Sequence, residues 1–349
     1  FILGMPTSVS IADDSGFDVR NQSLGSFVQD TWRVGRNLTV NLGLRFEWEN
    51  GIKEAQDRSL LWFDPDAPVS IAGAAEAAYA RNPIPEVPAS QFKVRGGSIY
   101  AGATGFDDRS WEPEALFMPR LSFGYRLGEK MAVKGGYGMY YDTLNARDWT
   151  PDLQGFNITT TNPLSNDFGL TFNLGDPRKG ILPIADPFPV RPTTGDRYES
   201  VLGNALGLDT MLGRAYSAEN PNRTHSRVQR WRLAWQREIA SRTALEVAYS
   251  GSYADRQGIT IREDFLPEQY WSDADFRHTS ANNYLTQNVP NPFHISNFAS
   301  LQTTDPQLYQ RLLGSTVFTS TTIPRHRLLR AFPHMSTGAG LTSLDQPLG

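Results

Sequence analysis

Residues 37–49 read NLTVNLGLRFEWE, and every second residue from Leu38 to Trp48 is apolar. The intervening positions carry Asn, Thr, Gly, Arg or Glu. Because successive side chains of a β-strand point to opposite faces, the stretch predicts a strand with one apolar and one polar face. A strand of this length, tilted by about 45°, rises roughly 30 Å, the thickness of a membrane's hydrocarbon core. The pattern also fits a long strand of a soluble β-sandwich, so this stretch alone leaves both folds open.

The composition narrows the class of protein. A net charge of −4 argues against a nucleic-acid-binding protein. The chain has no cysteine, which excludes a disulfide framework and a thiolate metal site. No run of 18 apolar residues predicts a transmembrane helix. A barrel strand needs no such run, because only every second residue faces lipid.

Two further pairs of alternating segments resemble the pair that contains residues 37–49. The three predicted hairpins cover residues 22–49, 120–142 and 228–253, and each is joined by a short turn, at residues 35–36, 128–130 and 240–242. Long segments without a strand period separate them, at residues 50–119, 143–226 and 254–349. Prolines such as Pro65 and Pro68 are expected to break any strand in the first of these, although residues 71–80 favour a short helix.

The order of short and long connections decides between the two folds. Compact soluble domains rarely contain structureless loops longer than about 15 residues. Outer-membrane barrels have short periplasmic turns and long extracellular loops. We therefore predict an all-β fold, a partial transmembrane antiparallel β-barrel in the bacterial outer membrane. Its six clear strands, or seven or eight if the two ends of the sequence add strands, fall at or below the smallest barrels of eight. The outer strands therefore need neighbours from the same parent chain or from another chain, and we expect the same chain.

The alternation assigns side chains to the two faces of this wall. A charge facing lipid at mid-membrane costs about 2–4 kcal/mol, so polar residues should face the lumen. The expected lumen-facing residues are Asn41, Arg45, Glu47, Arg120, Arg126, Lys134, Arg230, Arg232 and Glu246. The expected lipid-facing or girdle residues are Leu42, Leu44, Phe46, Trp48, Phe123, Tyr125, Trp231 and Trp235. The charged residues that face the lumen either pair with groups of a plug inside the barrel or line the path of a substrate.

Several of these segments resemble TonB-dependent outer-membrane receptors. The resemblance rests on residues 27–32 (FVQDTW) with 38–47 (LTVNLGLRFE), 119–125 (PRLSFGY) with 135–142 (GGYGMYYD), and 229–252. Residues 328–333 (LLRAFP), together with the segments 119–125, 135–142 and 229–252, narrow it to the Oar-like branch. The motifs occur in the family's order over most of the chain, while the loops diverge.

The resemblance implies a barrel of about 22 strands closed by a plug, with uptake of a large substrate driven by the TonB system. The expected partners are outer-membrane lipid and lipopolysaccharide, the rest of the same barrel and its plug, and TonB for the parent protein. We find no plug domain and no TonB-contacting segment in the sequence, so energy coupling is inferred for the parent protein alone.

Signals for catalysis or for a cofactor are weak. The five histidines lie in or beside long segments without a zinc-binding spacing, and no nucleophile elbow or phosphate loop occurs. We predict no enzyme activity and no cofactor. Calcium in the outer loops stays an alternative at the acidic pairs 13–14, 107–108 and 263–264, and residues 325–330 form a basic loop tip that could meet lipopolysaccharide. A structural or adhesive surface protein is the alternative function.

Overall fold

Six long strands form one antiparallel sheet, in the order β12-β11-β9-β8-β4-β3. The computed structural model describes the chain apart from residues 1–4, 15, 104–107, 143–150, 176–178, 192–194, 216, 219, 221, 263, 272–277, 337–341 and 348–349. The strands are β3 (Ser23–Val34), β4 (Leu38–Glu49), β8 (Glu114–Arg126), β9 (Met131–Tyr141), β11 (Arg227–Ala240) and β12 (Thr243–Asp255). They are the six strands expected from the alternating sequence.

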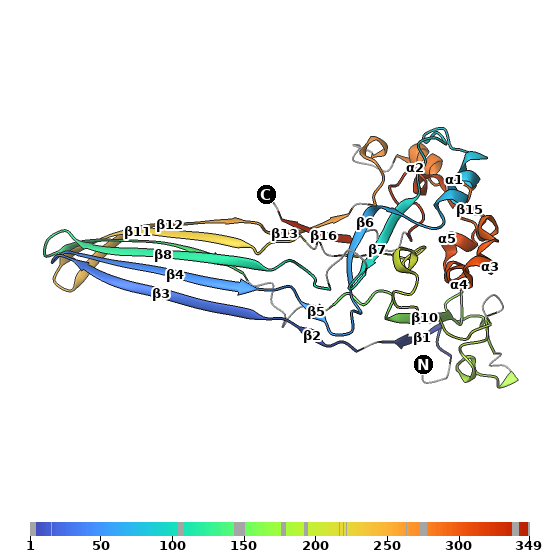
Figure 1. Cartoon of the computed structure of the whole chain (residues 1–349), viewed down its shortest axis with the longest axis horizontal. Helices are drawn as coiled ribbons and strands as arrows, with labels where there is room; N and C mark the ends of the chain where they lie inside the picture. Colours follow the sequence, from blue (N-terminus) through green and yellow to red (C-terminus); the bar gives the residue numbers. More distant parts are fainter. Residues whose placement is uncertain are drawn as a thin grey trace.

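All three tight turns lie at one end of the sheet and the long connecting segments at the other (Figure 1). The turn between β3 and β4 contains Gly35 at φ 78°, and the turn between β11 and β12 contains Arg242 at φ 64°. Positive φ suits the right-handed twist of a two-stranded hairpin, which explains why these short connections close tightly.

Strand β8 begins earlier than the sequence pattern predicts, at Glu114 rather than at residue 120. Between these positions Leu116 and Met118 are buried on one face, while Phe117 is exposed on the other. Both faces are therefore apolar in this part of β8, and the period-2 signal that marks the rest of the strand is absent.

The sheet is not closed. Among the described residues β3 and β12 each pair with one neighbour in this sheet, so each leaves one row of backbone groups without a strand partner. Within the described part of the chain, no helix is long and apolar enough to cross a membrane.

The long segments fold into a compact head at the other end of the sheet (Figure 1). Its helices are α1 (Ala72–Ala80), α2 (Thr279–Leu285), α3 (Leu301–Thr304), α4 (Pro306–Leu313) and α5 (Thr316–Thr319). Its short antiparallel pairs are β6 (Leu60–Pro68) with β7 (Arg95–Tyr100), β14 (Asn288–Pro290) with β15 (Thr322–Pro324), and β1 (Ser8–Asp13) with β10 (Ile158–Pro163). Two further pairs are β2 (Val19–Arg20) with β5 (Lys53–Glu54), and β13 (Gly258–Arg262) with β16 (Thr342–Pro347).

The head has a hydrophobic core of its own. The aromatic rings of Tyr79 and Phe92 stack at 3.8 Å between centroids, and Phe293 packs edge-on against Phe318 at 6.4 Å. These residues come from the first and third long segments, and Leu212 of the second joins the same cluster. A smaller cluster around Phe63, Tyr100 and Phe332 lies beside it.

The expectation that the long segments are irregular is therefore wrong for parts of the first and third segments, whereas the described residues of the second, 143–226, form only β10 and two short 3-10 helices. Strand β6 contains both Pro65 and Pro68, although the prolines were expected to prevent a strand. Its pairing with β7 is interrupted between Asp64 and Pro68, which places the missing N–H groups at an irregularity of the ladder. The short helix expected at residues 71–80 is present as α1.

Gly96 tests the packing of the head. It has φ 106°, and a Cβ there would lie 2.5 Å from Phe63 Cζ and 2.8 Å from the Phe332 ring. Gly96→Ala should destabilise the head by about 2 kcal/mol or more, because it combines backbone strain with overpacking. Gly73→Ala in α1 meets no atom within 4 Å and should stabilise it by about 0.5–1 kcal/mol. Proteolysis of the purified protein in detergent measures both, and equal behaviour of the two variants would contradict this packing.

Candidate functional site

Strand register gathers the predicted polar residues on one face of the sheet. Asn41 lies opposite both Thr31 and Ser122. Arg120 and Arg230 lie opposite Gly138 from its two sides. By the same alternation, this face carries Asn41, Arg45, Glu47, Arg120, Arg126, Lys134, Arg230, Arg232 and Glu246. We call it the polar face.

The polar face is hollowed at its middle. A shallow cavity of about 770 Å³ lies over β4, β8, β9, β11 and β12, and its lining includes Asn41, Arg120, Ser122, Arg230 and Arg232. Gly136 and Gly138 of β9 lie in its floor, and the Tyr140 side chain covers Gly138, where a Cβ would lie 2.6 Å from the phenol oxygen. The hollow is therefore a polar surface with a positive centre.

Most polar residues around the hollow have partners on the same face. Thr31 Oγ1 donates to Asn41 Oδ1 at 2.7 Å, and Asn41 Nδ2 donates to Ser122 Oγ at 3.0 Å. Arg45 pairs with Glu47, Arg232 pairs with Glu246, and Lys134 Nζ donates to Gln236 Oε1 at 3.0 Å. Arg126 Nη2 donates to the carbonyl of Arg36 in a tight turn.

Arg120 and Arg230 differ from these residues. Arg120 lies over the ring of Tyr140, 5.0 Å from its centroid, which is a cation–π contact. Neither arginine forms an ion pair with a described residue. The polar face thus presents two guanidinium groups without a carboxylate partner at the centre of its hollow.

The opposite face of the sheet is apolar and exposed. The same register places Leu42, Leu44, Phe46, Trp48, Phe123, Tyr125, Trp231 and Trp235 on it. The rings of Phe46 and Phe117 lie 5.2 Å apart between centroids. A Cβ at Gly251 would lie 2.7 Å from the Trp231 indole, so glycine lets this ring lie flat on the neighbouring strand.

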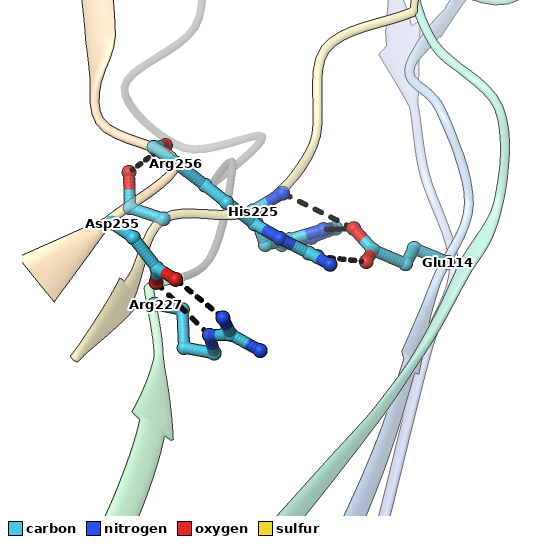
Figure 2. Close-up of polar contacts among 6 residues, drawn as sticks. Glu114, His225, Arg227, Asp255 and Arg256 are labelled. Carbon is cyan, nitrogen blue, oxygen red and sulfur yellow. Dashed lines mark hydrogen bonds and ion pairs between the residues drawn. The ribbon is translucent and has the colours of Figure 1, made fainter. Parts of the chain in front are cut away.

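His225 forms a second polar centre where the sheet meets the head. Its side chain is 1% exposed. Nδ1 lies 2.8 Å from Glu114 Oε2, and Nε2 lies 3.0 Å from Glu49 Oε2. Arg256 Nη1 donates to the other oxygen of Glu114 at 2.9 Å, and Arg227 pairs with Asp255 nearby (Figure 2).

Strand ends bring this cluster together. Glu49 ends β4, Glu114 begins β8, and His225 precedes β11 by two residues. In an antiparallel sheet the C-terminus of one strand and the N-terminus of the next lie at the same end of the sheet. Here that end is the one that carries the head (Figure 1). Because β9 separates β8 from β11, His225 connects strands that are not neighbours in the sheet.

The environment of His225 favours its charged form. Burial opposes the charge, but hydrogen bonds to Glu49 and Glu114 outweigh it and raise the pKa above the ordinary 6.5. Only the protonated ring can donate from both nitrogens, one to each carboxylate. Among the described residues no serine or other nucleophile contacts this ring, so the cluster acts as a charged clasp between strands.

Sequence analysis missed this cluster. It treated His225 as a loop histidine and began β8 six residues too late, beyond Glu114. A usable signal exists: Glu49 and His225 each lie next to the head end of an alternating segment, where polar side chains from several strands meet.

The acidic pairs considered for calcium gain no support from the described residues, where no group of three potential ligands occurs. Asp108 binds Lys53, and Asp264 accepts from the backbone of Phe332 and pairs with Arg330. Asp107 and Glu263 lie outside the described residues. Asp13 and Asp14 lie at and after the end of β1.

The basic loop tip expected at residues 325–330 is wrong. Arg327 is buried and donates to the carbonyls of Pro333 and Met335. Arg325 pairs with Glu86 and lies 4.4 Å from the centroid of the Tyr284 ring. These cations hold segments of the head together, because each is already paired inside the protein.

The His225 clasp predicts a pH dependence. A group whose pKa is raised by folding stabilises the fold fully below its unfolded pKa, here 6.5, and loses that contribution as the pH rises through the native pKa. His225→Gln should lower stability by about 3 kcal/mol below pH 6.5, because it breaks a buried ion pair, and should flatten this pH dependence. His294→Gln is the control, since the half-buried His294 ring hydrogen-bonds, among the described residues, only with Ser296. Thermal unfolding of the intact protein measures both, and an unchanged pH profile in His225→Gln would contradict the clasp.

Comparison with known proteins identifies the family. Residues 1–316 match the model described as outer membrane beta barrel domain. No curated protein matches the chain. Among solved structures the chain is similar to a double mutant of the Serratia marcescens hemophore receptor HasR, in complex with its hemophore HasA and heme, at 12% identity and a TM-score of 0.31. The match covers 71% of this chain and 27% of that chain, so this chain spans about a quarter of the receptor. Because the family model covers most of the sequence, the chain belongs to the outer membrane beta-barrel domain family and lies in the bacterial outer membrane.

Proposed function

We propose that the chain is a wall segment, with its outer loops, of a TonB-dependent receptor that carries a large solute across the outer membrane. The polar face lines the lumen and the apolar face contacts lipid. The head lies outside the cell, near lipopolysaccharide, and the tight turns lie in the periplasm. The rest of the same barrel, a plug and the TonB system are the partners, and the Oar-like branch is the proposed subgroup.

The observation that carries this proposal is the arginine pair in the hollow. Burial or enclosure of a charge without a partner is costly, so charges inside a narrow anchor barrel are expected to pair with one another. Arg45 and Arg232 follow this rule and Lys134 is hydrogen-bonded to a neutral amide, whereas Arg120 and Arg230 have no carboxylate partner among the described residues. Two free guanidinium groups suit a wall that faces acidic groups of a plug or of a passing solute.

The alternative function is an adhesive surface protein in which the barrel is an anchor. The exposed side chains of Phe168 and Leu170 in the head favour it, because isolated apolar residues at a loop tip can bind a partner protein. Both functions are non-enzymatic.

Sidedness can be tested with two adjacent residues of β8. The chain has no cysteine, so Leu121→Cys and Ser122→Cys each introduce a single labelling site. A spin label at residue 121 should collide with oxygen dissolved in lipid, whereas a label at residue 122 should be shielded from it, because the two side chains point to opposite faces. Electron paramagnetic resonance in reconstituted membranes measures the accessibility. The reverse result would place the polar face in lipid and reject the assignment.

Transport can be separated from adhesion by genetics. Deleting the gene for the parent protein and deleting tonB should abolish growth on the same macromolecular nutrient, in a panel of oligosaccharides, oligopeptides and ferric siderophores. Arg120→Ala with Arg230→Ala should slow that growth at least tenfold, while Arg126→Ala, which removes a contact to a turn, should leave it unchanged. Normal growth of the parent deletion on every nutrient, together with lost surface attachment, would favour adhesion.

A further inference from the structure

The head contains a cavity that belongs neither to the hollow nor to the His225 clasp. It measures about 430 Å³ and is lined by residues of the second long segment, among them Arg191, Glu199 and Arg214, and by one face of α4, including Gln307, Gln310 and Arg311. Figure 1 places α4 in the head, away from the strands of the wall. The cavity has the size of a small-molecule site.

Arg311 is the unusual residue of this cavity. Its side chain is only 7% exposed, and Nε donates to the carbonyl of Thr210 at 3.1 Å. The guanidinium group has five N–H donors, yet this carbonyl is its one hydrogen-bond partner among the described residues. Burial, followed by the positive charge of Arg214, lowers the pKa of Arg311 to about 10. The negative charge of Glu199 opposes that shift but does not outweigh the burial.

A second buried arginine of the head, Arg327, has more hydrogen-bond partners than Arg311. Arg327 is 9% exposed and donates to two carbonyls, those of Pro333 and Met335. It lies outside the cavity. Arg311 has similar burial but keeps most of its donors free, which suggests that its partner comes from outside the chain.

The other residues that line the cavity indicate which chemical class of ligand fits it. Arg214 is neutralised by its ion pair with Glu199, so it adds no net charge. The side chains of Gln307 and Gln310 are exposed and form no hydrogen bond with a described residue. They can donate to and accept from hydroxyl groups. Glu199 and Asp196, which also lines the cavity, disfavour a second negative charge nearby, so a single anionic group with a polar remainder fits best.

We propose that this cavity binds a small hydroxylated organic anion, with its carboxylate or phosphate group on Arg311 and its hydroxyl groups near Gln307 and Gln310. A guanidinium group binds the planar edge of either oxyanion through two parallel hydrogen bonds. Binding at this site does not require that the anion is transported. A receptor that fails to import a solute can still bind it here, so the two proposals fail separately.

Calorimetric titration of the intact detergent-purified protein tests the site. Glucuronate and glucose 6-phosphate are the probes for the two oxyanions, and glucose is the neutral control. Binding of either anion, with no binding of glucose, supports the proposal, and the tighter anion identifies the preferred oxyanion. Equal binding of glucose, or no binding of any probe, would overturn it.

Two pairs of variants separate recognition from folding. Arg311→Gln should weaken anion binding at least tenfold, while Arg327→Gln, which changes an equally buried arginine outside the cavity, should leave the affinity unchanged. Gln310→Glu adds a carboxylate at an exposed position and should also weaken binding at least tenfold, whereas Gln302→Glu on α3, outside the cavity, should not. Equal losses within each pair would show a structural or long-range effect and would overturn the site.

Discussion

The wall depends on one constraint: in hydrocarbon, every backbone N–H and C=O group needs a hydrogen-bond partner inside the protein. Strands β4 and β11 satisfy this requirement on both sides through long antiparallel ladders, whereas β8 pairs with β9 only over residues 120–126. The outer edges of β3 and β12 do not meet it within the described sheet. In a membrane these two edges require further strands, and this requirement, more than any side chain, defines the chain as part of a larger barrel.

Apolar side chains are arranged in opposite ways in the six-stranded sheet and in the head. In the sheet, apolar residues such as Leu42 and Trp235 lie on the face opposite the polar face, which in the proposed barrel contacts lipid instead of a protein core. In the head, Phe293 and Phe318 point inward and pack together, because water surrounds the head. The change occurs at the ends of the strands, where Leu116 and Met118 are already buried on the polar-face side of β8.

The alternation of apolar and polar residues is present in the long strands and absent in the head. This difference explains which parts of the fold could be predicted from the sequence. Alternation along β4 predicted the strand, its two faces and its hairpin with β3, since period 2 has a single structural meaning in a long segment. It failed at residues 114–119, where both faces are apolar. It also failed in the head, where pairing of β6 with β7 tolerates Pro65 and Pro68 because the ladder is irregular there. The His225 clasp depends on which strand ends become neighbours, and a local pattern does not contain that information.

The clasp has a mechanical role that follows from its position. The chain passes from the sheet into the head at the ends of the long strands. His225 joins the start of β11 to the ends of β4 and β8, and Arg256 joins the end of β12 to the same glutamate. Four strand ends thus share one charged cluster. Because Glu114 is held by both cations, the cluster ties these four strand ends to one another at the point where the head begins.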